Sequence, residues 1–226
     1  MKKALVLCGR TTLDNDMSIG GIADVSDKPS TTPVVNITGD LTALGPFDES
    51  MAEALHRWYN DFAVAVLNGS VPHPQTIEVS RGEVERFSND DKTRYAFAIY
   101  ERMTMRLIGF VDLRNIDYRQ RTAELGIMIG EQDCWGKGFG TETLYLVLDY
   151  AFSVLGLHNI MLSMAGYNER ALRTYRRVGF REIGRRREVC AIGNRFYNAV
   201  FMDCLSTEFH SPLAPIVTLP SQAEIS

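Results

Sequence analysis

The chain has 226 residues, of which 45% are hydrophobic and 23% are charged, a length that suits one folded domain with tails. Its formal net charge of -4 argues against nucleic acid as the main partner, because that role requires concentrated positive charge. An apolar stretch too short for a secretory signal follows Lys2 and Lys3, and no long apolar run occurs later. We therefore expect a soluble protein without a membrane partner.

Cysteine usage points to a reducing compartment. The chain has no Cys-x-x-Cys pair and no histidine near a cysteine at ligand spacing; its cysteines are Cys8, Cys134, Cys190 and Cys204. We expect a cytoplasmic protein with neither a disulfide framework nor a metal site.

The two ends of the chain differ in composition from the middle. Residues 10–36 are rich in Ser, Thr, Asp, Gly and Pro, so residues 1–35 are interpreted as an N-terminal extension. Residues 206–226 carry three prolines without sustained periodicity, which predicts a C-terminal tail that drapes over the body or a partner chain. Residues 36–205 form the expected domain.

The first predicted elements are a strand and two helices. The strand covers Asn36 to Leu44, and Asp48 then caps a helix in which apolar residues follow helical spacing. A second short helix is expected from Thr76 to Phe87, with Gly82 as its weak point.

An antiparallel meander comes next. Three segments alternate with a period of two, Tyr95 to Ile99, Met105 to Leu113 and Ala123 to Ile129, and residues 117–120 form the turn between the last two.

Helical spacing then takes over from Gly140 to Leu155, and Gly156 ends this strongest helix. The remaining expected elements are a strand (His158 to Met164), a helix (Asn168 to Val178, closed by Gly179) and a last strand (Arg195 to Leu205). The order predicts a mixed α/β fold with a mostly antiparallel sheet flanked by helices.

A glycine-rich segment, Trp135 to Gly140, lies between the last meander strand and the strongest helix; we call it the glycine loop. Glycines at alternate positions let a diphosphate approach the backbone, and the following helix directs free N–H groups at the anion. A Walker loop would need Ser or Thr after the lysine, and a Rossmann fingerprint would need an early βαβ unit, so both fit poorly. A flexible connection is the alternative interpretation of the loop alone.

Three motifs together resemble the GNAT acetyltransferases, particularly the RimJ/RimL-like branch. They are Glu124 to Gly130, Trp135 to Thr141, and Asn168 to Tyr175 followed by Val178-Gly179-Phe180. The resemblance covers roughly residues 36–205 and implies a GNAT-like acyl-CoA N-acyltransferase fold with acetyl-CoA as co-substrate. Trp135 stands where the family pattern has Gln or Arg.

The resemblance also implies a set of cofactor-binding residues. A splayed, bulged strand would hold the pantetheine arm and polarise the thioester carbonyl, and Gly126 is where a bulge would be cheapest. The implied contacts are Ile127, Met128, Ile129, Trp135, Gly136, Lys137, Gly138, Phe139, Gly140, Thr141, Asn168, Ala171 and Arg177.

Two residues are implied to be catalytic. Tyr175 matches a tyrosine that protonates the departing thiolate, and its alternative is a half-buried core aromatic. Glu124 matches an acid that draws a proton from the amine, and its alternative is an exposed strand carboxylate paired with Arg119 or Arg121. The basic segment between Arg170 and Arg187 has a solvated helix face as its alternative, although Arg173, Arg176 or Arg177 would suit the 3'-phosphate of CoA.

The acceptor is expected to be a primary amine of a metabolite, an antibiotic or a polyamine, and the acidic balance slightly favours a cationic one. Trp58, Asp61 and His73 fall in the part of the chain that forms the acceptor pocket in relatives, although a Trp on a helix stripe is more often core. Three alternatives stay open: a peptide N-terminal acetyltransferase, a non-catalytic CoA-binding sensor module and a purely structural protein. A homodimer is also possible.

Overall fold

The computed structural model describes residues 32–69, 71–88 and 92–216. Most of the predicted N-terminal extension and the last ten residues of the predicted tail lie outside the described residues. Within them, no helix is long and apolar enough to cross a membrane.

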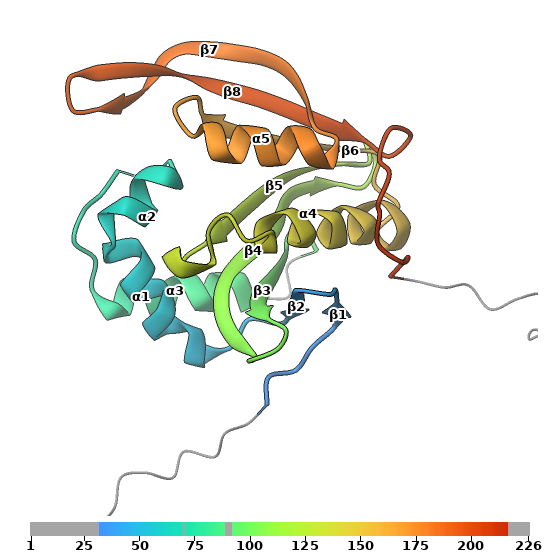
Figure 1. The fold of residues 1–226 in the computed structure, drawn as a ribbon, viewed down its shortest axis with the longest axis horizontal. Coiled ribbons are helices and arrows are strands. Elements are labelled where there is room, and N and C mark those ends of the chain that lie inside the picture. Colours follow the sequence, from blue (N-terminus) through green and yellow to red (C-terminus); the bar gives the residue numbers. More distant parts are fainter. Residues whose placement is uncertain (1–31, 70, 89–91, 217–226) are drawn as a thin grey trace, which may run out of the picture. The chain divides into compact units, whose positions relative to one another are not determined.

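The described chain forms a sheet of eight strands in the order β1-β2-β3-β4-β5-β6-β8-β7 (Figure 1). All neighbours pair antiparallel except β5 and β6, which are parallel. The strands are β1 (Ile37–Thr38), β2 (Thr42–Gly45), β3 (Tyr95–Glu101), β4 (Arg106–Asp117), β5 (Thr122–Ile129), β6 (Asn159–Ala165), β7 (Arg181–Ile192) and β8 (Arg195–Leu205). The predicted mixed, mostly antiparallel α/β class is confirmed.

Helices cover both faces of this sheet (Figure 1). One core cluster packs under α1 (Ala52–Asn60), α2 (Phe62–Leu67) and α3 (Ile77–Ser88). The other packs under α4 (Phe139–Asp149), its π-helical continuation η3 (Tyr150–Val154) and α5 (Glu169–Val178). Strand β4 supplies both, because Phe110 belongs to the first cluster and Val111 to the second.

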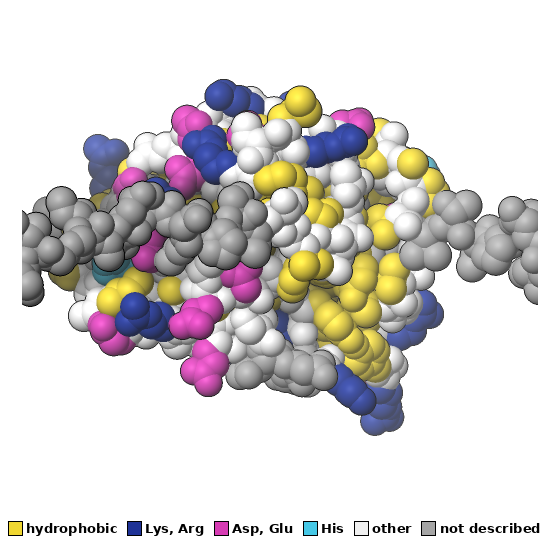
Figure 2. Space-filling model, turned by 90° about the horizontal axis from the view of Figure 1, so that it is seen from below, with side chains coloured by type: hydrophobic (Ala, Val, Ile, Leu, Met, Phe, Trp, Pro, Cys, Tyr) yellow, Lys and Arg dark blue, Asp and Glu magenta, His cyan; other side chains and the backbone are white. Residues whose placement is uncertain are grey.

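The surface seen in Figure 2 carries acidic and basic side chains side by side, with apolar side chains gathered toward one part of the view.

Several helix ends follow the capping chemistry read from the sequence. The Asp48 side chain accepts a hydrogen bond from the Ser50 N–H, at a 3-10 turn, η1 (Glu49–Met51), that leads into α1. Asn168 caps α5, and Gly179 ends it in the left-handed conformation with φ of 116°.

Two elements were missed. Helix α2 is six residues long and too short to show a period, and it begins because Asp61 accepts hydrogen bonds from the Ala63 and Val64 N–H groups. Strand β7 lies at one edge of the sheet and is exposed along most of its length, so its sequence lacks the apolar alternation that marks a half-buried strand. Part of the arginine-rich segment, Arg185 to Arg187, therefore lies on a strand.

The predicted first strand was also wrong in one respect, because a turn at 39–41 splits it into β1 and β2. The Glu142 carboxylate, in the first turn of α4, causes this split. It accepts hydrogen bonds from the N–H groups of Asp40, Leu41 and Thr42 at 2.6 to 2.9 Å, and from the Thr42 hydroxyl at 2.8 Å. Glu142 thus fastens the start of α4 to the far edge of the sheet.

The described part of the C-terminal tail packs on the domain. Phe209, Leu213 and Ile216 contact the core cluster under α4, and the Ile216 N–H donates to Asp149 at 2.8 Å. This packing agrees with a tail that drapes over the body.

Replacing Glu142 by alanine should lower the free energy of unfolding by about 3 kcal/mol, because it removes hydrogen bonds to a charged acceptor and leaves the buried Thr42 hydroxyl without it. Urea unfolding of the purified variant measures this loss. The matched control is Glu169→Ala, which removes an exposed first-turn glutamate of α5 and should change stability by less than about 0.5 kcal/mol. Equal losses in the two variants would contradict the role of Glu142.

Candidate active site

Strands β5 and β6 separate soon after they meet. Their parallel pairing covers Thr122 to Glu124, whereas β5 pairs with β4 up to Ile129 and β6 pairs with β8 up to Ala165. The Gly130 N–H donates to the Ile108 carbonyl on β4. Because N–H groups along a strand point alternately to the two sides, the Ile127 N–H, three residues earlier, points away from β4 and into the gap. The predicted splay of this strand is therefore present.

The β-bulge expected at Gly126 is absent from β5. The register between β4 and β5 runs without a shift from Glu124 to Ile129. Gly126 lies opposite Asp112, and a Cβ atom there would collide with the side chains of Asp112 and Arg114. The absence of a side chain at Gly126 thus leaves room for the ion pair between Asp112 and Arg114 on the neighbouring strand β4.

The gap opens into a pocket of about 650 Å³ between the glycine loop, β4, β5, β6 and α5. Many residues predicted from the sequence line it: Ile127, Met128, Ile129, Trp135, Gly136, Gly138, Gly140, Thr141, Asn168, Ala171, Tyr175 and Arg177. Lys137 is exposed and Phe139 is buried in the core, so neither belongs to the lining.

The glycine loop has the geometry of an anion site. Gly136 and Gly138 have φ values of 77° and 97°, which residues with a side chain rarely adopt. Gly138 is the N-cap of α4, so the first N–H groups of the helix, which have no acceptor within the helix, face the pocket beside Gly140 and Thr141. This arrangement fits the diphosphate of CoA.

Trp135 connects the loop to the sheet. Its indole N–H donates to the Ile129 carbonyl at 2.8 Å, and the Arg170 guanidinium lies 4.2 Å from the centre of its ring. Burial lowers the pKa of Arg170. Trp135 therefore positions both the glycine loop and Arg170. These contacts explain how a tryptophan can replace the Gln or Arg of the family pattern at this position.

Both polar groups of the Asn168 side chain form hydrogen bonds to the protein backbone. Its oxygen accepts from the Ala171 N–H at 3.1 Å, and its amide donates to the Leu67 carbonyl at 2.8 Å. The cap therefore ties the start of α5 to the end of α2, while Asn168 still lines the pocket.

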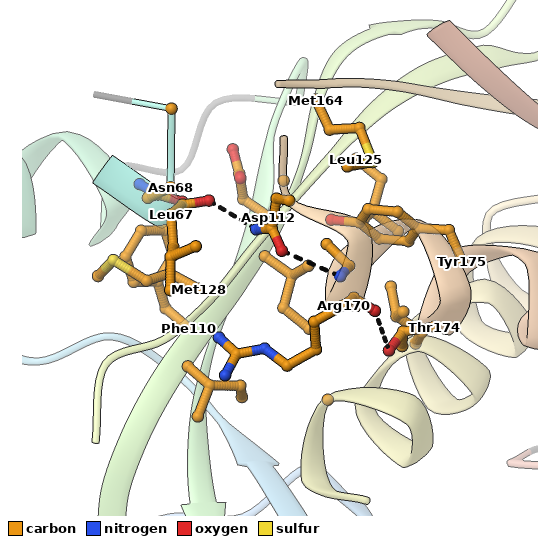
Figure 3. Close-up of a pocket in the computed structure, with 18 of the residues that line it drawn as sticks. Leu67, Asn68, Phe110, Asp112, Leu125, Met128, Met164, Arg170, Thr174 and Tyr175 are labelled. Carbon is orange, nitrogen blue, oxygen red and sulfur yellow. Dashed lines mark hydrogen bonds between the residues drawn. The ribbon is translucent and has the colours of Figure 1, made fainter. Parts of the chain in front are cut away.

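Tyr175 extends from α5 into the pocket, where Asp112 approaches from β4 (Figure 3). Its half-buried ring packs against Phe180, with centroids 5.7 Å apart. Burial raises the pKa of Tyr175 to about 12, and the nearby Arg114 guanidinium partly opposes that increase. The phenol is therefore protonated at neutral pH and available as a proton donor.

Glu124 lies beside the pocket without lining it. Its side chain is 40% exposed and forms an ion pair with Arg114 at 3.5 Å. Neither Arg119 nor Arg121 is this partner; the Arg121 guanidinium donates to the Gly156 carbonyl.

Sequence reasoning missed Asp112, a buried acid on β4 that lines the pocket. It pairs with Arg114 at 3.2 Å and with Arg94 at 3.8 Å. Burial raises the pKa of Asp112, and the two arginines oppose the shift. An acid inside the apolar run of β4 was the available signal.

The three residues predicted to contact the acceptor lie outside the pocket lining. Trp58 is 2% exposed and belongs to the core, and its indole N–H donates to Glu131 at 3.0 Å. Asp61 caps α2, and His73 is exposed, with its ring nitrogen 2.9 Å from the Val71 carbonyl. For Trp58 the structure agrees with the core alternative.

Among the described residues, no group of three or more His, Cys, Asp or Glu side chains is placed to hold a metal ion.

Residues 42–181 match the family model described as the acetyltransferase (GNAT) domain. The chain belongs to the GNAT acetyltransferases. The GNAT-like fold implied by the sequence motifs is thereby confirmed.

Relatives agree with this assignment. The chain is 37% identical over 103 residues to a spermidine N(1)-acetyltransferase from Vibrio cholerae, an alignment that covers 46% of this chain and 59% of the relative. A second relative, from Caenorhabditis briggsae, is an N-acetyltransferase 9-like protein that is 24% identical, with 66% of this chain and 79% of the relative covered.

A solved structure is similar over a longer span. The spermidine N-acetyltransferase from Vibrio cholerae in complex with CoA and spermine superimposes with a TM-score of 0.67 at 26% identity, covering 75% of this chain and 98% of that one. In sequence, by contrast, the chain spans 59% and 50% of the curated spermidine acetyltransferases of Vibrio cholerae and Escherichia coli.

Replacing Gly140 by valine should weaken CoA binding by about tenfold, on the order of the penalty for overfilling a packed site. Gly140 lines the pocket but has only an ordinary contact, 3.6 Å to Ile129, so the fold should persist. The matched control is Gly82→Val, the same change in α3 at a site with open space around it. Calorimetric titration with CoA measures both, and equal affinities would contradict the phosphate site.

Proposed function

We propose that the chain transfers the acetyl group of acetyl-CoA to a primary amine. The observation that carries this proposal is Tyr175, a protonated phenol in the pocket that opens where β5 and β6 separate, next to the glycine loop. Acetyl-CoA supplies an activated acyl group. The protein must hold it, stabilise the oxyanion that forms on its carbonyl and return a proton to its thiolate.

Each of these tasks has a candidate group. The helix start after Gly138 receives the diphosphate, and Arg177 lies at the same pocket as a partner for the 3'-phosphate. The Ile127 N–H, directed into the gap, donates to the thioester carbonyl. The amine nitrogen then bonds to the carbonyl carbon, the carbon–sulfur bond breaks, and Tyr175 gives its proton to the sulfur.

The proton transfer is uphill unless the site helps it. With a phenol pKa of about 12 and an ordinary thiol value of about 8.5, the cost is on the order of 5 kcal/mol. The departing thiolate is desolvated in the same pocket, which raises its own proton affinity. Arg114 reduces the cost of this transfer, because its positive charge lowers the pKa of Tyr175.

The amine must lose a proton, and two acids lie near the gap. Glu124, the residue implied by the family, is partly exposed and can pass the proton to water. Asp112 lines the pocket itself and is the better placed to contact the amine. Arg114 contacts both acids, and its positive charge disfavours the transfer of a proton to either of them.

The choice of acceptor is supported by relatives. The spermidine acetyltransferases named above favour a small amine, such as a polyamine, over a peptide N-terminus. A non-catalytic CoA sensor would need the phosphate site but would not need Tyr175 in the pocket.

We further propose a cytoplasmic homodimer. The exposed edge strand β7, with Ile183 and Val189 open to solvent, supports the dimer.

Replacing Tyr175 by phenylalanine should lower kcat by about tenfold or more, the order of magnitude that general acid catalysis supplies, with acetyl-CoA affinity unchanged. Because the pKa of Tyr175 is about 12, wild-type kcat should show no loss from phenol ionisation up to pH 10. Steady-state thiol release with saturating amine measures both.

The matched control is Tyr145→Phe, in α4, whose hydroxyl donates to the Arg177 carbonyl outside the pocket lining. It should keep kcat close to that of the wild type. A Tyr175→Phe variant with wild-type kcat would remove this residue from the mechanism, and CoA binding without acetyl transfer to any amine would favour the sensor.

A further inference from the structure

The pocket continues past the gap to the face of the sheet covered by α1 and α3. There it is lined by Phe87, Arg94, Phe110, Asp112 and Arg114, which we call the acceptor end. Asp112 is in register with Gly126, the residue before Ile127. A molecule bound in the acceptor end therefore reaches the thioester from the side opposite the glycine loop.

The acceptor end contains two buried polar atoms of opposite charge that lack a hydrogen-bond partner among the described residues. They are Oδ2 of Asp112 and Nη1 of Arg94. The two side chains form an ion pair through the Arg94 Nε at 3.8 Å, but that contact satisfies neither atom. Buried polar atoms without partners cost stability, so a pair of them in a pocket indicates a ligand that completes both.

Arg94 is held in place for such a ligand. Its guanidinium lies 5.1 Å from the centre of the Phe87 ring, and its side chain is 20% exposed. The neighbouring basic residues are already paired, because Arg86 contacts Glu83 and Arg114 contacts Asp112 and Glu124. Arg94 thus has the least satisfied guanidinium of this group.

The charges at the acceptor end disfavour a polycation. A polyamine would satisfy Asp112 but would place further positive charge beside the guanidinium groups of Arg94 and Arg114. An amine that also carries an anion satisfies both open atoms. A carboxylate fits better than a phosphate, since it brings one negative charge to one open guanidinium and less repulsion from Asp112.

We propose that the acceptor is an amine that bears a carboxylate, with Asp112 binding the amino group and Arg94 binding the carboxylate. This inference rests on the proposed acetyl transfer and names its substrate class. It separates this chain from the relatives named for spermidine.

The test compares amines that differ by a carboxylate: ornithine against putrescine, and 4-aminobutyrate against propylamine, with spermidine as the polycation. In wild-type protein, kcat/KM from thiol release should be at least about tenfold higher for the carboxylated member of each pair. Arg94→Gln should abolish this preference, raising KM for the carboxylated amine roughly ten- to hundredfold and leaving KM for its partner unchanged. Arg94→Lys should restore part of it.

Arg86→Gln is the matched control, because Arg86 packs on Phe87 at 5.3 Å but is paired with Glu83 and more than half exposed. It should keep the preference. Unchanged circular dichroism and CoA affinity would show that Arg94→Gln is folded. Calorimetric titration of the CoA-bound protein with the same pairs gives a second readout: the carboxylated member should bind more tightly than its partner to wild type and to Arg86→Gln, but not to Arg94→Gln.

A wild-type enzyme that prefers putrescine or spermidine, or an Arg94→Gln variant with the wild-type preference, would overturn the inference while leaving acetyl transfer intact. If no pair turns over, the absence of carboxylate-dependent binding in the calorimetric titration would overturn it. Failure of the proposed function looks different: acetyl-CoA would not bind, or thiol would not be released with any amine, spermidine included.

Discussion

The pocket exists because two strands that begin as partners are each held more firmly by another neighbour. Strand β5 stays bonded to β4 through Ile129, and β6 stays bonded to β8 through Ala165, so neither can move to close the gap after Glu124. Backbone groups of β5 that a sheet would normally pair are therefore open to a ligand. The glycine loop is held at the end of this gap, because the Trp135 indole N–H donates to the carbonyl of Ile129, the last residue of β5.

Helix α5 is braced on the other side of this gap. Asn168 and Tyr167 donate to the Leu67 and Val66 carbonyls, so the start of α5 is fastened to the end of α2. Leu172 and Tyr175 pack against the core at the same time. This bracing holds the Tyr175 ring in the pocket, where burial keeps the phenol protonated.

Arg114 is the electrostatic centre of the site. It contacts Asp112 and Glu124 and lowers the pKa of Tyr175, so one guanidinium influences the candidate acid and both candidate bases. A charge in this position offsets the cost of burying a carboxylate. It also contributes to the basic character of the acceptor end, although the chain as a whole is acidic.

Local signals in the sequence predicted much of the fold. The glycine loop, the Asn168 cap and the Gly179 helix end are chemical requirements of the backbone at single positions, and the structure has them where the sequence placed them. The motifs also predicted Tyr175 and the loop residues that line the pocket. The role of these residues in binding and catalysis stays a prediction.

What the sequence missed depends on tertiary structure. Strand β7 has no buried face, and helix α2 is shorter than two turns, so neither leaves a periodic pattern. The contact between Asp112 and Arg94 depends on the register of β3 against β4, which pairs Tyr95 with Leu113, and no local pattern reveals it. For the same reason the overall acidity suggested a cationic acceptor, whereas the pocket itself is rich in arginine.

The central claim is that acetyl-CoA binds in the gap between β5 and β6. Hydrogen–deuterium exchange with and without acetyl-CoA measures this most directly, because it reports on the backbone groups themselves. The account predicts slower exchange at 125–129 of β5 and at the start of α4 around Gly140, with β7 unchanged. Unchanged exchange in both segments at a saturating acetyl-CoA concentration would contradict it.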